Sequence, residues 1–153
     1  KRCAELDIPI TVHMGYTTTL RAPLDFQRPS LLDEIGMRFP GLKLIVAHLG
    51  SHWSYETLML MEKHPTFCAD TAFIWFPIDH IARTLSWAKH FGSIRRILYG
   101  SDYPLHDPGA GIKLLQRVPE YTETRGIEPV VTDEDIALVL GGNAAAYFGV
   151  QET

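Results

Sequence analysis

Several features that would assign a protein to a large functional class are scarce or absent in this sequence. Two cysteines, Cys3 and Cys68, are too few for a disulfide framework, so a reducing, cytoplasmic setting is the default expectation. No apolar run approaches the length of a membrane span, and the first residues do not resemble a signal peptide. A formal net charge of −4 provides no basic field. We therefore expect no nucleic-acid or membrane partner.

Two short motifs are also missing. No strand-like run is followed by a glycine-rich phosphate loop of the form G-x-G-x-x-G, so a doubly wound nucleotide-binding sheet lacks support. No H-x-H pair occurs anywhere in the chain. What remains is an ordinary globular balance of 46% hydrophobic and 21% charged residues over 153 positions, which is enough for one domain with a sizeable core.

Four short apolar runs have the composition of buried strands, because they are rich in Ile, Val, Thr and aromatic residues and too short for independent helices. The expected strands are 8–13, 42–48, 66–72 and 95–102. Segments with helical character lie between and after them, at 30–39, 55–64, 79–91, 111–118 and 132–140. Thr132 is the expected N-cap of the helix at 132–140, Gly141-Gly142 is expected to end it, and a last short helix follows.

The alternation of strands and helices at about 25–35 residues per unit predicts βαβ crossovers and a parallel sheet. The predicted fold class is α/β, with parallel (β/α) units that form a single domain over residues 1–153. Four such units are half of a TIM-type (β/α)8 barrel, which usually needs about 250 residues. The chain opens as the end of a helix that runs straight into a strand, so we also expect it to be a piece of a longer polypeptide.

Three of the four expected strands end in a residue that can bind a metal: His13, His48 and Asp102. Because the carboxyl ends of parallel strands open onto one face, where active sites form, we expect these side chains to converge. Imidazole nitrogens and a carboxylate are ligands that catalytic zinc accepts. Each residue alone has a simpler explanation, a structural hydrogen bond or a turn cap, but three in comparable positions favour a metal site.

Five segments together resemble the amidohydrolase-2 family: PITVHMG, FPGLKLIVAHLGSHW, HPTFCADTA, RRILYGSDYP and VLGGNAAAYFG. That family consists of metal-dependent TIM-barrel proteins and includes relatives of aminocarboxymuconate-semialdehyde decarboxylase. The resemblance covers almost the whole chain and implies strands five to eight, the C-terminal half of the barrel. His13 would be the strand-five metal ligand. His48 would bind a second metal or polarise the substrate and the attacking water. Asp102 would touch the metal and accept a proton, whereas Asp70 is expected to make a structural hydrogen bond.

The sequence departs from the family pattern because the H-x-H pair, which supplies two metal ligands on strand one, is missing together with strands one to four. At best half of the site is present, so the affinity for a divalent metal, zinc in the first place, should fall steeply unless a partner chain completes the shell. The resemblance implies a metal-dependent hydrolase that cleaves a C–O or C–N bond of a small-molecule substrate through a metal-activated water. A decarboxylase of the same family and a non-catalytic half-barrel stay open as alternatives.

A half-barrel exposes sheet edges and apolar surface that the other half would cover. Burying a few hundred Å² of such surface contributes several kcal/mol at about 25 cal/mol per Å². We therefore expect a homo-oligomer, a homodimer first, or a missing N-terminal half of the same polypeptide. Other residues are weaker candidates for substrate contact: His52, Trp53, Tyr103, His106, Asp107 and Arg21. The remaining histidines are expected to lie toward solvent: His64, His80 and His90.

Overall fold

The structure of the chain is a computed structural model that describes residues 1–72 and 77–150. The chain divides into two compact units, Lys1–Asp70 and Thr71–Thr153, and each unit has its own strands and helices. Among the described residues, no helix has both the length and the hydropathy needed to cross a membrane.

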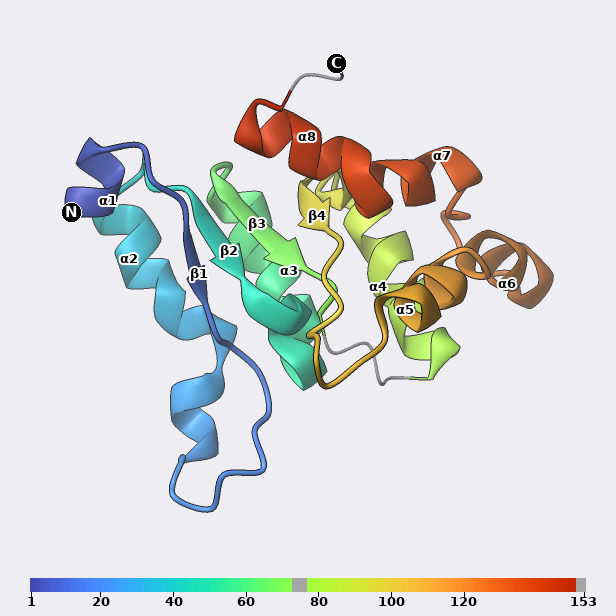
Figure 1. The fold of residues 1–153 in the computed structure, drawn as a ribbon, viewed down its shortest axis with the longest axis horizontal. Helices are drawn as coiled ribbons and strands as arrows, with labels where there is room; N and C mark the ends of the chain where they lie inside the picture. Colours follow the sequence, from blue (N-terminus) through green and yellow to red (C-terminus); the bar gives the residue numbers. More distant parts are fainter. Residues whose placement is uncertain (73–76, 151–153) are drawn as a thin grey trace. The chain divides into compact units, whose positions relative to one another are not determined.

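The first unit contains a parallel sheet of β1 (Ile10–Val12), β2 (Leu44–Val46) and β3 (Phe67–Asp70) (Figure 1). Val12 pairs with Val46, and Val46 pairs with Ala69, so the three strands end at nearly the same level. The helices of this unit are α1 (Arg2–Glu5), α2 (Asp33–Arg38) and α3 (Ser54–Lys63). Short 3₁₀ segments occupy Leu24–Gln27, Pro29–Leu32 and Ala47–Trp53.

Burial distinguishes the strands of this sheet. All three residues of β2 are buried, as expected for a central strand covered on both faces. Ile10 and Val12 of β1 are only half-buried and Thr11 is exposed, which is typical of an edge strand. Strand β1, which is followed directly by His13, is therefore an edge strand of this sheet.

The second unit contains β4 (Ile97–Leu98) and five α-helices among its described residues: α4 (Ile78–His90), α5 (Pro108–Leu115), α6 (Val118–Arg125), α7 (Asp133–Ala137) and α8 (Asn143–Phe148). The backbone N–H of Thr71 donates to the carbonyl of Leu98 at 2.9 Å, so the chain that follows β3 runs beside β4. Helix α4 packs against α6, and α8 packs against β4. Ile81, Ala82 and Leu85 of α4 are fully or almost fully buried.

The α/β alternation predicted from the sequence is confirmed, but the strands are shorter than expected. The predicted strand 95–102 is reduced to Ile97–Leu98, because an irregular segment begins at Tyr99. Helix α6 was not predicted, since only Val118 and Thr122 on it are buried, too few to create a visible apolar pattern. Thr132 is confirmed as the N-cap of α7, where it forms a capping box with Asp135.

The prediction that Gly141-Gly142 ends the helix after Thr132 is wrong. A π-helix at Leu138–Gly142 joins α7 directly to α8, so the chain stays helical through both glycines. The reason lies one residue further on. Asn143 is buried and its side-chain amide donates to the carbonyls of Ile94 (2.9 Å) and Ile97 (2.7 Å). These tertiary hydrogen bonds outweigh the low helix propensity of glycine.

We predict that Asn143→Ala lowers the free energy of unfolding by about 1–3 kcal/mol, because the buried side-chain amide that donates to the carbonyls of Ile94 and Ile97 is removed. Urea denaturation followed by circular dichroism measures the change. Gln116→Ala, which removes an exposed amide in the same unit, is the control and should alter stability by less than about 0.5 kcal/mol. Equal stability of the two variants would refute the role of Asn143.

His64 is not the solvent-side residue that the sequence suggested. It is 8% exposed, its ring lies 4.8 Å from that of Phe67, and its Nε2 hydrogen-bonds Asp33 Oδ1 at 2.7 Å. Lys63 donates to the other carboxylate oxygen of Asp33 at 2.7 Å. Gly36 leaves room for the imidazole, since a Cβ there would lie 2.6 Å from the ring. Helix α2 is thus joined to the end of α3 through one carboxylate.

The pKa of Asp33 is lowered from its ordinary value of 3.8, first by the hydrogen bond from Lys63 and then by that from His64. A lowered carboxyl pKa stabilises the fold above the ordinary value, and this contribution is lost as the pH falls through the folded-state pKa. Asp33→Asn should therefore destabilise the protein at neutral pH, and the difference from wild type should shrink in acid.

Urea unfolding of both proteins across the acid range tests this pH dependence. Asp25→Asn, an exposed carboxylate of the same unit, should show no comparable pH-dependent difference. A gap between wild type and Asp33→Asn that stays constant from neutral pH into acid would contradict the assignment.

Candidate metal centre

His13 and His48 lie together at the carboxyl end of the first unit's sheet. His13 directly follows β1, and His48 is the second residue after β2, whose last residue pairs with the last residue of β1. The centroids of the two imidazole rings are 4.9 Å apart and the rings meet edge to face at 69°. His13 is exposed and His48 is half-buried. Of the three predicted ligands, the structure therefore brings these two together.

The backbone around His48 explains the His-Leu-Gly sequence that follows β2. Four consecutive residues have positive φ: His48 (60°), Leu49 (49°), Gly50 (69°) and Ser51 (56°). Left-handed conformations are unfavourable for residues with a Cβ, at about 1–3 kcal/mol each. The turn reverses the chain within a few residues, buries Leu49 and Ser51, and leads into α3 at Ser54. The histidine is thus held at the end of the strand by a strained but buried turn.

Asp70 fixes this turn from the neighbouring strand. Its Oδ1 accepts the backbone N–H of His48 at 2.8 Å, which links the end of β3 to the residue after β2. The structural hydrogen bond expected for Asp70 is confirmed. A carboxylate acceptor makes a stronger bond than a neutral oxygen does, so it offsets part of the strain at His48.

Two glycines allow the segments around the histidines to approach closely. Gly15 has φ +107° and a Cβ at that position would lie 2.5 Å from Cβ of Ser51. At Gly50, a Cβ would lie 2.3 Å from Oγ1 of Thr57 and 2.6 Å from Pro29. Neither glycine can be replaced without displacing a neighbour, so both serve the packing of the turn rather than an open entrance to the site.

A second ring pair lies next to the first, and sequence reasoning identified only half of it. The rings of Tyr16 and His52 are 5.7 Å apart at 80°, and His52 Nδ1 lies 3.5 Å from Ser51 Oγ. Tyr16 was missed because it belongs to a segment without periodicity. Buried Gln27 organises that segment, since its side chain accepts from the N–H of Thr17 at 2.8 Å and donates to the carbonyl of Ala22 at 2.9 Å.

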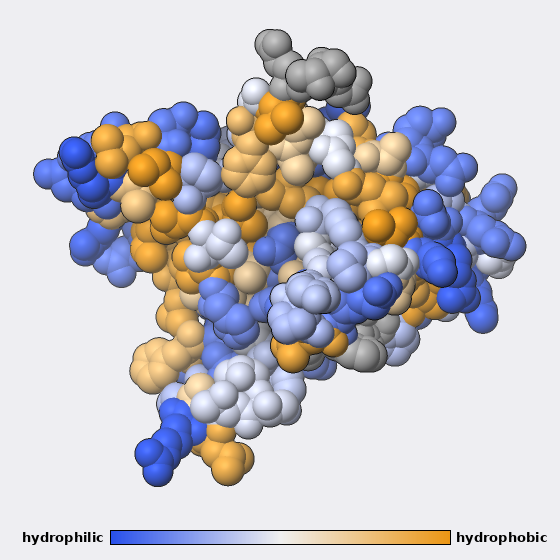
Figure 2. Space-filling model, in the orientation of Figure 1, coloured by the Kyte–Doolittle hydropathy of each residue, from blue (hydrophilic) through white to orange (hydrophobic). Residues whose placement is uncertain are grey.

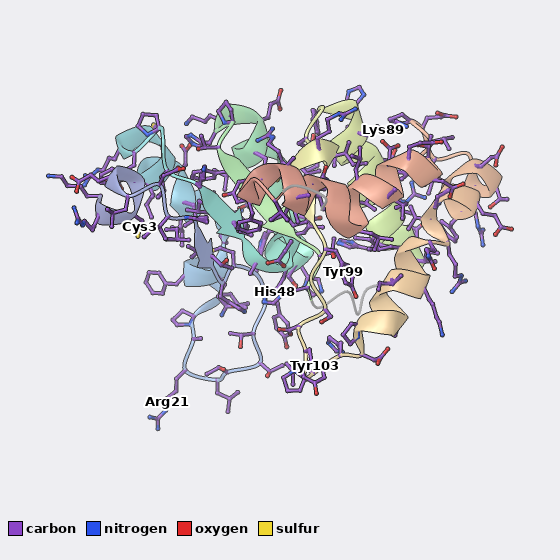
Figure 3. The ribbon with its side chains drawn as sticks, turned by 45° about the horizontal axis from the view of Figure 1, so that its top comes forward. Cys3, Arg21, His48, Lys89, Tyr99 and Tyr103 are labelled. Atoms are coloured by element: carbon purple, nitrogen blue, oxygen red, sulfur yellow. The ribbon has the colours of Figure 1, made fainter. Side chains whose placement is uncertain are left out.

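Arg21, a weaker candidate for substrate contact, lies far along the same loop. Figure 3 shows its side chain at the tip of the segment between β1 and α2, pointing away from His48. The residue is exposed. It therefore makes no contribution to the pair of imidazoles in this structure.

Asp102 belongs to the second unit and lies four residues beyond the end of β4, not at the end of a strand as predicted. It is half-buried and has φ 64°. The turn around it is held by the N–H of Tyr103, which donates to Ser101 Oγ at 3.2 Å, and by the N–H of Leu105, which donates to the carbonyl of Asp102 at 2.9 Å. Its carboxylate is thus presented by a defined turn after β4.

The donor chemistry at His13 and His48 suits a divalent metal, because imidazole nitrogen is a common ligand of zinc and related ions. Neither unit, over its described residues, contains a group of three or more His, Cys, Asp or Glu side chains arranged to hold a metal ion. The first unit therefore supplies a pair of imidazoles, which is part of a coordination shell and not a complete one.

Comparison with solved structures identifies the fold. An uncharacterized TIM-barrel protein from Bordetella bronchiseptica is 21% identical, with a TM-score of 0.69 over 97% of this chain and 48% of its own. An amidohydrolase from Burkholderia multivorans with bound zinc is 15% identical, with a TM-score of 0.70 over 98% and 55%. A dihydroxybenzoic acid decarboxylase from a Polaromonas species, with bound manganese, is 14% identical, with a TM-score of 0.60 over 99% and 52%.

These matches confirm that the parallel (β/α) units form half of a TIM-type barrel, since the chain spans about half the length of each matched structure. The amidohydrolase family model matches residues 1–150, and the chain belongs to that family. No curated protein matches the sequence. Two points stay predictions: that residues 1–153 form a single domain, and that their strands correspond to barrel strands five to eight.

We predict that Gly50→Ala destabilises the protein by about 2–4 kcal/mol, because the new Cβ meets Thr57 and Pro29 and the residue must keep a positive φ. Gly41→Ala is the matched control, since nothing lies within 4 Å of a Cβ at that position, and it should change stability by less than about 0.5 kcal/mol. Urea unfolding measures both. A Gly50→Ala protein as stable as Gly41→Ala would disprove the packing described for the turn.

Proposed function

We propose that this chain is part of a metal-dependent hydrolase that cleaves a C–O or C–N bond of a small organic substrate with a metal-activated water. The observation that carries the proposal is the contact of His13 and His48, 4.9 Å between ring centroids, at the ends of two paired parallel strands. The chain belongs to the amidohydrolase family, and one structurally similar amidohydrolase contains zinc.

His13, His48 and Asp102 are the proposed metal ligands, and zinc is the first choice of metal, with manganese as the alternative found in a similar structure. When bound, a divalent cation lowers the pKa of a coordinated water toward neutrality and polarises the scissile group. Two imidazoles and a carboxylate match the three protein ligands of many catalytic zinc sites.

The chain's own residues would divide the remaining tasks. His48, whose backbone is tied to Asp70, would stabilise the negative charge that develops on the substrate, because a donor held in place needs no reorganisation during the reaction. Asp102 would accept the proton of the water as general base and return it to the leaving group. The turn that presents Asp102, with two backbone hydrogen bonds around it, suits a residue that must accept and release a proton at one position.

A decarboxylase is the second candidate reaction, and the similarity to a dihydroxybenzoic acid decarboxylase favours it. The same ligands serve both chemistries, so the residues do not separate them. Release of carbon dioxide from carboxylated aromatic compounds would identify the decarboxylase, and hydrolysis of esters, lactones or amides would identify the hydrolase. A non-catalytic half-barrel is the third candidate.

We further propose that a second copy of the chain, or the N-terminal half of the barrel on the same polypeptide, covers the edge of the first unit. Strand β1 is part-exposed, and Leu6 and Ile8, which precede it, are 48% and 50% exposed. Figure 2 shows hydrophobic residues, in orange, at the surface of this unit. An exposed strand edge beside apolar side chains favours pairing with another chain segment. We also propose a reducing, cytoplasmic setting, in which Cys3 and Cys68 stay free thiols.

We predict that the purified protein binds zinc and that His13→Asn or His48→Asn weakens this binding by about tenfold or more, because each removes one imidazole ligand. Competition with a chromophoric zinc chelator measures the affinity, and mass spectrometry measures metal content and intact mass. His90→Asn, an exposed histidine of α4, is the control and should bind zinc like wild type.

Hydrolysis and carbon dioxide release are then assayed on the zinc-loaded proteins, with the oligomeric state measured in the same samples. Loss of zinc together with loss of turnover in both variants supports the proposal. Zinc affinity that is the same in wild type, His13→Asn and His48→Asn would exclude this pair as metal ligands.

A further inference from the structure

A cavity of about 560 Å³ lies in the second unit, between the segment that follows β4 and helix α5. Its volume falls within the range of about 300–1,000 Å³ that is typical of small-molecule sites. The described residues that line it belong to the second unit, from Gly100 to Arg117. None of these residues is one of the proposed metal ligands.

One part of the cavity wall is apolar. Leu105 comes from the segment after β4, and Ala110 and Leu114 come from α5. Gly111 brings the helix close to the end of β4, since a Cβ there would lie 2.9 Å from the hydroxyl of Tyr99. That hydroxyl donates to the carbonyl of Pro108, which ties the start of α5 to the same segment. The cavity is therefore shaped by a helix fixed at a short distance from the chain after β4.

Another part of the wall carries positive charge, from Lys113 and Arg117. Lys113 lies on α5 and Arg117 lies in the turn between α5 and α6, and both line the cavity. Neither forms an ion pair with any residue in the described part of the chain. Two like charges that line the same cavity repel each other, and a bound anion would relieve that repulsion.

The one carboxylate in the wall does not cancel these charges. Asp107 is the N-cap of α5, and its Oδ1 accepts the backbone N–H of Ala110 at 2.8 Å. This places its negative charge at the positive end of the helix dipole. Ser101 and His106, from the segment after β4, add a hydroxyl and an imidazole to the wall.

We propose that this cavity binds a small organic acid, with the carboxylate between Lys113 and Arg117 and the apolar body against Leu105 and Leu114. Arginine suits this role because its guanidinium donates two parallel hydrogen bonds to a carboxylate. The apolar wall would favour an aromatic or branched acid over a bare inorganic anion. The site goes beyond the proposed function, and it can exist whether or not the chain binds a metal.

Isothermal titration calorimetry of the metal-free full chain with benzoate tests the proposal, with benzyl alcohol and inorganic phosphate as comparison ligands. Benzoate should bind in preference to both, because benzyl alcohol lacks the charge and phosphate lacks the apolar body. Lys113→Gln and Arg117→Gln should each weaken benzoate binding by about tenfold. Ala110→Trp, which fills the cavity and leaves both cations in place, should abolish it.

Arg95→Gln is the matched control, since it removes an exposed cation of the same unit that does not line the cavity. It should leave benzoate binding unchanged, and circular dichroism melting curves establish that every variant is folded. The proposal is overturned if benzoate does not bind, if phosphate binds as tightly as benzoate, or if Ala110→Trp binds benzoate like wild type. Failure of zinc binding at His13 and His48 would leave these results unaffected, so the two proposals can fail separately.

Discussion

The hydrogen bond from the N–H of His48 to the carboxylate of Asp70 is the constraint on which the candidate metal centre depends. Three residues with a Cβ hold left-handed conformations in the turn after β2, at a cost of about 1–3 kcal/mol each. One hydrogen bond to a charged acceptor contributes about 1.5–3 kcal/mol, which is too little alone. Burial of the apolar side chain of Leu49 contributes further stabilisation to the turn. The end of β3 therefore positions the imidazole of His48 after β2. A substitution at Asp70 would alter the position of His48.

The two imidazoles differ in how firmly the chain supports them. His48 is half-buried and follows a fully buried strand, whereas His13 is exposed and follows the part-exposed edge strand β1. Preorganised coordination requires ligands whose orientation is fixed by their surroundings. In this pair, the chain holds His48 firmly in place, whereas His13 lies at the edge strand where the sheet of a complete barrel would continue. This asymmetry agrees with a chain that spans about half the length of its structural relatives.

The sequence predicted the order of strands and helices and the proximity of His13 and His48, because both follow from the spacing of apolar runs and the geometry of parallel strands. It also predicted the hydrogen bond of Asp70 and the cap at Thr132. It did not predict that helix continues through Gly141-Gly142, since the cause is a hydrogen bond from Asn143 to residues more than 40 positions away. The contact of Tyr16 with His52 was not predicted for a similar reason, because a segment of irregular backbone, without a periodic pattern, brings the two rings together.

The amide of Asn143 also has a consequence for the order in which the second unit matures during translation. Strand β4 leaves the ribosome well before the side-chain amide that donates to it, because Asn143 is synthesised 46 residues after Ile97. Until that asparagine emerges, the carbonyls of Ile94 and Ile97 lack the side-chain amide that both accept from in the folded chain, and Ile94 has only the N–H of Ile97 as a donor from its own turn. Helix α8 therefore completes the hydrogen bonds around β4, and a nascent chain that stalls before Asn143 would leave β4 without the amide that donates to it.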